Sequence, residues 1–125
     1  MITIKTAHAT KPQLNWLLAK MQGFGAEVYE CNRERWALGL PRPNHWNPVE
    51  DWNQGGPMLK LYRVEVNNGL DGFIGTANKY WWPAELGGTD VRQVHVAESG
   101  DYLLAGLKAL VLAHYGETTE VPERV

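Results

Sequence analysis

The chain has 125 residues, 44% of them hydrophobic, so it is long enough to bury a core without disulfides or a structural metal ion. Acids and bases are interspersed and the net charge is only −2, which argues against non-specific nucleic acid binding because no basic block is available to neutralise phosphates. The single Cys31 cannot form a disulfide within the chain, and no apolar run approaches the roughly 20 residues that cross a bilayer. We therefore expect one domain over residues 1–125, in a reducing compartment, with no membrane segment and no signal peptide.

The N-terminal part predicts a short strand followed by an amphipathic helix. Residues 1–6 alternate apolar and polar side chains, as a strand does. Thr10 can cap a helix that carries Pro12 in its first turn and ends before Gly23. The apolar side chains recur at helical spacing, at Leu14, Leu17, Leu18 and Met21. This pattern predicts a helix over residues 11–22 whose apolar face belongs to the core.

The middle of the chain predicts short strands and one long loop. Residues 26–40 mix β-forming side chains with charges and stop at the Pro-Arg-Pro of residues 41–43, which favours one or two short exposed strands. From there to about Pro57 we expect a surface loop, and loops of this length inside a domain are often functional. Residues 58–66 fit a short helical turn that passes into a strand.

The C-terminal part predicts two further strands and a second long helix. Residues 67–72 read as a turn, 73–82 as a strand, and 91–98 as another strand. A helix over about 101–115 follows, capped by Ser99 or Asp101 and closed by Gly116, with its apolar stripe at Leu103, Leu104, Leu107, Leu110, Val111 and His114. From about residue 117 we expect an extended polar tail, because it carries no packing pattern.

These elements predict an α+β fold. We expect a small, mostly antiparallel sheet, two main helices at about 11–22 and 101–115, and a long Trp-rich loop. Ala105 and Gly106 in the second helix leave room for another backbone to approach closely. This favours tight packing within one chain, with a homo-oligomer as the alternative.

The Trp-rich loop, His45 to Pro57, is the candidate site. It combines aromatic rings, amides, two acids and a Gly-Gly pair whose backbone N–H groups could hold an anion. These groups suit a small planar or anionic ligand such as a nucleotide, and they equally suit a protein partner, since interface energy concentrates on tryptophan. A third interpretation makes the loop a lid over the core. The candidate binding residues are Trp46, Asp51, Trp52, Asn53, Gly55, Gly56 and Trp81, with Trp81 and Trp82 placed on opposite faces of a strand.

Catalytic and metal chemistry find little support in the sequence. The histidines are scattered without metal-ligand spacing, so we expect no metal and no cofactor. His95 is interpreted as a surface residue and His114 as a core or interface residue. An enzyme would have to use Asp51, Glu50 or His45 as acid or base, whereas Asp51 could equally brace the loop through an Asx turn.

Several segments together resemble the NinX-like family of small phage and prophage proteins, a domain family of unknown function. They are an early helix of the LNWLLAKMQG kind, the DWNQGGP stretch, and a C-terminal helix running into GETTEVPERV. The best anchors of the resemblance are Trp52, Gly55, Gly56, Pro57, Leu104, Gly116 and Pro122. Before the tryptophan the family tends to have a Tyr-Ser-Pro-Ser-like lead, where this chain has HWNPVE.

The resemblance implies a phage-encoded accessory protein that acts in the cytoplasm of the bacterial host. It brings no agreed catalytic residues. We therefore expect a non-enzymatic binding module for a host protein or a small ligand, and by analogy a role in countering host defence. The alternative is a small enzyme or a sponge for a nucleotide-like ligand.

Overall fold

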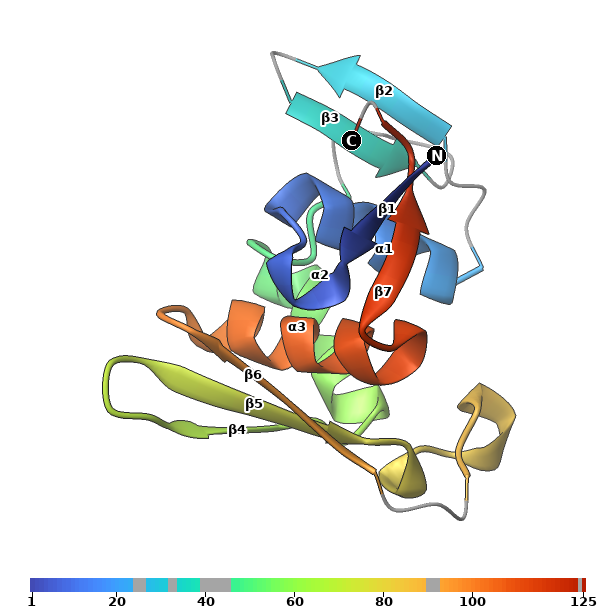
Figure 1. Cartoon of the computed structure of the whole chain (residues 1–125). Helices are drawn as coiled ribbons and strands as arrows, with labels where there is room; N and C mark the ends of the chain where they lie inside the picture. The colour runs from blue at the N-terminus through green and yellow to red at the C-terminus, as the bar shows by residue number, and fades with distance from the viewer. Residues whose placement is uncertain (24–26, 32–33, 39–45, 90–92, 124) are drawn as a thin grey trace.

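Helices and antiparallel strands share this chain, which confirms the α+β prediction (Figure 1). The computed structural model describes residues 1–23, 27–31, 34–38, 46–89, 93–123 and 125. Its helices and strands are β1 (Ile2–Lys5), α1 (Lys11–Met21), β2 (Glu27–Cys31), β3 (Glu34–Leu38), α2 (Trp52–Leu61), β4 (Glu65–Asn68), β5 (Phe73–Asn78), β6 (Val94–Ser99), α3 (Tyr102–Tyr115) and β7 (Thr118–Val121). Short 3₁₀ turns are η1 (Thr6–His8), η3 (Lys79–Trp81) and η4 (Ala84–Leu86). No helix among these described segments is long and apolar enough to cross a membrane.

The strands form three separate antiparallel groups. β4, β5 and β6 make a sheet in that order, β2 pairs with β3, and β1 pairs with β7. The three-stranded sheet lies along one side of α3, and α1 and the β1–β7 pair lie on the other side (Figure 1). α3 is therefore the central element of the molecule.

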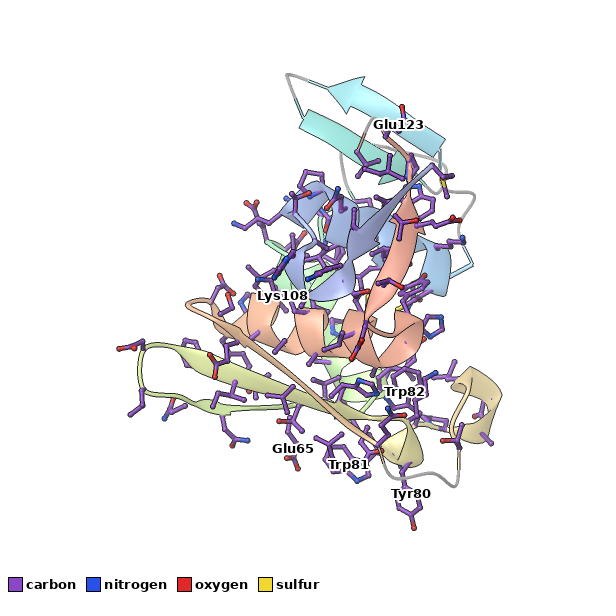
Figure 2. All side chains as sticks on the ribbon, viewed as in Figure 1. Glu65, Tyr80, Trp81, Trp82, Lys108 and Glu123 are labelled. Carbon is purple, nitrogen blue, oxygen red and sulfur yellow. The ribbon has the colours of Figure 1, made fainter. Side chains whose placement is uncertain are left out.

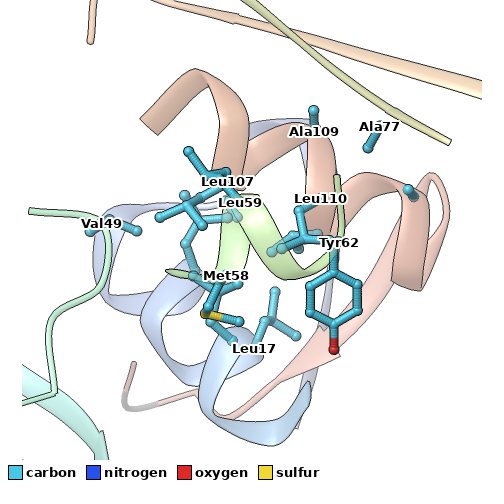
Figure 3. Packing of buried hydrophobic residues seen from close by; sticks show 14 of the residues in the cluster. Leu17, Val49, Met58, Leu59, Tyr62, Ala77, Leu107, Ala109 and Leu110 are labelled. Carbon is cyan, nitrogen blue, oxygen red and sulfur yellow. The ribbon is translucent and has the colours of Figure 1, made fainter. Parts of the chain in front are cut away.

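Apolar side chains from the three helices fill the core (Figure 3). The stripe expected on α1 is fully buried at Leu14, Leu17 and Leu18, and α3 contributes Leu107 and Leu110 at 0% exposure. Both predicted helix starts are confirmed. Thr10 and Gln13 exchange hydrogen bonds as a capping box at α1, and Asp101 accepts from the backbone N–H of Leu104 at α3.

Glycines let the backbone of α3 approach its neighbours. A Cβ added to Gly75 in β5 would collide with the carbonyl group of Ala105, and one added to Gly106 would lie 2.7 Å from Cδ2 of Leu59 in α2. The expectation of close packing at Ala105 and Gly106 is thus met within one chain. Side chains at these points would force α3 away from the sheet and from α2.

The Trp-rich stretch is not one loop, because its second half is helix α2. Residues 52–57, including Gly55, Gly56 and Pro57, lie inside this helix although Gly and Pro are the poorest helix formers. Tertiary packing stabilises this helix despite its low intrinsic helix propensity. Gly55 is buried, and a Cβ there would collide with the carbonyl of Pro48 and lie 3.0 Å from Leu103 and Leu107. Residues 39–45, which include the first residues of the predicted loop, lie outside the described residues.

A buried asparagine holds the turn that leads into α2. Asn15 of α1 is 2% exposed; its amide donates to Asn47 Oδ1 at 2.9 Å, and its Oδ1 accepts from the backbone N–H of Val49 at 3.2 Å. The Asn47 backbone N–H donates to Gln54 Oε1 at 2.6 Å. Pro48 and Val49 are fully buried beneath these bonds, so the turn belongs to the core.

Two other sequence predictions need correction. The C-terminal segment from residue 117 is not a free tail, since Thr118–Val121 forms β7 against β1 and Val121 is 0% exposed. The strand predicted over 73–82 ends at Asn78, whose side chain accepts from the Tyr80 N–H and starts η3. Trp81 and Trp82 therefore do not lie on opposite faces of a strand.

We predict that Gly75→Ala destabilises the fold by roughly 1–3 kcal/mol, because the new Cβ overlaps the Ala105 carbonyl. Urea denaturation followed by circular dichroism measures the change. Gly100→Ala is the matched control: its Cβ meets nothing within 4 Å, so we expect a change within about 0.5 kcal/mol. Equal stability of the two variants would contradict the role given to Gly75.

We predict that Asn15→Ala lowers the free energy of unfolding by roughly 1–3 kcal/mol, because it leaves the buried Val49 N–H without its acceptor. Asn53→Ala serves as the control, since this side chain is exposed. The same denaturation measurement compares the two. An equal loss of unfolding free energy in Asn53→Ala and Asn15→Ala would contradict the stabilising role given to the buried hydrogen bonds of Asn15.

Candidate functional site

Trp46 supports the core and does not form an open binding wall. Its indole N–H donates to the backbone carbonyl of Asn15 at 2.7 Å, and its ring packs half-buried against the core. His45, the first residue of the Trp-rich loop, lies outside the described residues.

Asp51, Asn53 and Gly55 build the start of α2. The Asp51 carboxylate caps the helix by accepting from the Asn53 N–H at 2.9 Å, and the Asp51 carbonyl accepts from the Gly55 N–H at 2.9 Å. The bracing interpretation of Asp51 fits this geometry. Because Gly55 donates within the helix, and Gly56 follows it inside the same helix, the predicted anion nest of free Gly-Gly N–H groups is not formed.

Trp52 presents an exposed aromatic ring at the surface. It is the first residue of α2 and its side chain is 54% exposed. Its ring lies 5.5 Å from that of Tyr102, the first residue of α3, which is 41% exposed. Phe73, at the start of β5, contacts the other side of Tyr102 edge-on at 5.5 Å. Three elements thus bring three aromatic rings together at one end of the molecule.

A hollow of about 440 Å³ adjoins this aromatic row. Its walls come from the β4–β5 turn and the β6–α3 turn, residues 69–74 and 98–100, and include Phe73. Leu70, at the tip of the β4–β5 turn, is completely exposed. We call the surface formed by Trp52, Leu70, Phe73 and Tyr102 the end surface; it lies on the left in Figure 1, where these turns and the starts of α2 and α3 meet.

Carboxylates surround the end surface. Asp71 and Glu98 line the hollow, and Asp51 and Asp101 stand beside the two exposed rings as helix caps. The described residues that line the hollow include no lysine or arginine. The surface therefore offers apolar contact area together with negative charge, which favours a ligand that is apolar and cationic.

Trp81 does not join Trp52. It lies beyond the C-terminal end of α2, where its carbonyl accepts from Arg63 Nη1 at 3.0 Å. Trp52 begins α2, a helix of ten residues and roughly 15 Å, whereas Trp81 contacts Arg63, which follows the other end of that helix. Trp82 is buried, with its ring 4.9 Å from Tyr62 (Figure 2). The two aromatic walls expected from the sequence are not assembled into one site.

Sequence reasoning missed Leu70, Phe73 and Tyr102. Two of them carry a signal in hindsight: Leu70 is an apolar residue at the centre of a predicted turn, and Tyr102 lies off the apolar stripe of its helix. Their approach to Trp52 depends on the tertiary fold, so no spacing along the chain could reveal it.

No group of three or more His, Cys, Asp or Glu side chains that could hold a metal ion occurs within the part of the chain that the structure describes. At the end surface, the carboxylates nearest the exposed rings, Asp51 and Asp101, already accept backbone hydrogen bonds. This arrangement is suited to contact with a partner.

Residues 5–114 match the family described as "Bacteriophage P22, NinX". No curated protein matches the chain. The family match covers α1, α2, the three-stranded sheet and nearly all of α3, and it confirms the resemblance seen in the sequence. The chain belongs to the bacteriophage P22 NinX family.

Proposed function

We propose that this phage accessory protein is a non-enzymatic binding module that engages a host protein through the end surface. The observation that carries the proposal is the contact between Trp52 and Tyr102, two large rings with centroids 5.5 Å apart that remain 54% and 41% exposed. Tryptophan and tyrosine are the residues that most often dominate the energy of protein interfaces. Their exposure on a small protein has a physical reason if a partner covers them.

The rings are already ordered before binding. Trp52 and Tyr102 each occupy the first position of a capped helix, and Phe73 supports Tyr102 from the sheet. Side chains fixed in this way lose little conformational entropy when a partner binds. A rigid aromatic row is therefore an efficient anchor.

The charge around the row defines the partner's chemistry. Asp71 and Glu98 in the hollow, with Asp51 and Asp101 beside the rings, favour a host segment that carries lysine or arginine. Leu70 and Phe73 favour an apolar side chain in the same segment. We infer a partner surface that is apolar at its centre and basic at its rim.

The family match supports a proposal for the place and purpose of this contact. A phage accessory protein meets host proteins in the bacterial cytoplasm, and blocking a defence protein there is the role we favour. This part of the proposal rests on context, and the end surface supports only the binding step.

We predict that Trp52→Ala and Tyr102→Ala each weaken binding of the host partner by about 30-fold or more, as the loss of an interface anchor does. The partner is first identified by cross-linking in infected cells, and its affinity for each purified variant is then measured by calorimetry. Binding should also weaken as salt is raised, because the carboxylates attract a basic segment.

Tyr80→Ala is the matched control, because Tyr80 is 43% exposed but lies at η3, near Trp81 (Figure 2). Its affinity should equal that of the parent. Circular dichroism should show all three variants folded, since the side chains they remove are largely exposed. Equal weakening by Tyr80→Ala, or a contact satisfied by a second copy of the chain, would overturn the proposal.

A further inference from the structure

A second hollow, of about 280 Å³, lies at the opposite end of α3 from the end surface. We call it the His–Lys pocket. Its lining includes Lys79, Thr89, Gln93, His95, His114 and Gly116. Lys79 begins η3, His95 lies in β6 and His114 lies near the end of α3, so the fold brings together two histidines that the sequence analysis interpreted separately, His95 as a surface residue and His114 as a core or interface residue.

The backbone around the pocket is firmly held. The Lys79 carbonyl accepts from the N–H groups of Trp82 at 3.1 Å and Thr89 at 3.3 Å. At the other wall, the Tyr115 hydroxyl donates to the Leu17 carbonyl at 2.9 Å and fixes the end of α3 against α1. Lys79 and His114 therefore project from anchored positions.

The order of side chains within this end is also defined. His95 in β6 pairs with Ala77 in β5. Ala77 lies two residues before Lys79 along the chain. The Lys79 ammonium group is 5.8 Å from the centre of the buried Trp82 ring, and the His114 ring stacks on Trp82 at 6.0 Å (Figure 2). The lysine charge thus stands close to both imidazoles.

Among the described residues, Lys79 forms no ion pair with a carboxylate. The ion pair that the described residues do form joins Lys11 to Glu50, in another part of the molecule. The described residues that line the pocket include no aspartate or glutamate. Burial, and next the positive charge of Lys79, lower the pKa of His95 and of His114. Burial raises the pKa of Tyr62 and of Tyr115, the latter to about 12, so these phenols are neutral at pH 7.

The end of α3 opposes an anion only weakly. Its last carbonyl groups carry the negative end of the helix dipole, an effect of about 0.3–1 kcal/mol at an exposed helix end. A full ammonium charge and two imidazoles that can accept protons outweigh it when an anion is present. A cation would instead meet the repulsion of Lys79.

We propose that the His–Lys pocket binds a small molecule through a phosphate group, with Lys79 as the charged contact and His95 and His114 as hydrogen-bond donors. The volume of about 280 Å³ is slightly below the range of typical ligand pockets, and it suits a phosphate monoester. This site is distinct from the end surface, and it does not depend on the proposed host partner.

The test follows the imidazole signals of the full chain by NMR while inorganic phosphate, or adenosine monophosphate, is added against potassium chloride of equal ionic strength. We expect the pKa of both His95 and His114 to rise, because a bound anion stabilises the imidazolium form. His8, in η1, is the internal control and should not respond.

Lys79→Gln should weaken phosphate binding at least about tenfold, and Lys79→Arg should restore it. Without phosphate, Lys79→Gln should also raise the pKa of both histidines, because the nearby positive charge is gone. Lys108→Gln, in α3, is the charge-matched control and should bind as the parent does.

The proposal is overturned if neither phosphate nor adenosine monophosphate shifts the two histidines, if Lys79→Gln binds as well as the parent, or if His8 responds equally. Trp52→Ala should leave the phosphate titration unchanged. Failure of the end surface and failure of this pocket are therefore separate results.

Discussion

The backbone of β5 rests directly on the backbone of α3, where Gly75 faces the carbonyl of Ala105. On its other sides α3 packs closely against α2: Gly106 of α3 faces the side chain of Leu59, and Gly55 of α2 faces the side chains of Leu103 and Leu107. Contacts this close fix the position of the helix along its whole length. Its first residue, Tyr102, therefore belongs to a defined aromatic row, and His114, near its last, belongs to a defined pocket.

Charge follows the direction of the helices. Asp51 and Asp101 cap the starts of α2 and α3, where a helix attracts negative charge, and Arg63 and Lys79 lie near the ends, where it attracts positive charge. Each charge thus stabilises the fold and also shapes the surface around it. The same acids that begin the helices make the end surface attractive to a basic partner.

The sequence predicted the elements whose evidence is local. Capping residues and a helical apolar stripe placed α1 and α3 to within one residue at each end, and alternation located β1 and most of β5 and β6. Prediction from the sequence failed where contacts between residues far apart in the chain determine the secondary structure. Gly55, Gly56 and Pro57 look like a loop until Pro48 and α3 surround them, and a polar C-terminal segment becomes a strand only through its pairing with β1.

The candidate site was predicted in part for the same reason. The sequence singles out Trp52, which the fold leaves exposed, but its neighbour Tyr102 is fifty residues away in the chain. Trp46 and Asp51 have the right chemistry for binding, yet the Trp46 indole N–H already donates to the backbone carbonyl of Asn15, and the Asp51 carboxylate already accepts from the N–H of Asn53. Residue type alone does not show which polar groups are already hydrogen-bonded within the folded protein.

The pairing of β1 with β7 also sets an order of events during synthesis. Ile2 pairs with Val121, so β1 has no partner until the 119 residues from Thr3 to Val121 have been made. At roughly 5–20 residues per second this wait lasts several seconds. Meanwhile α1 exposes the apolar face that α3 later covers. Until residues 118–121 have been made, we expect nascent chains of this protein to bind chaperones that cover exposed apolar segments.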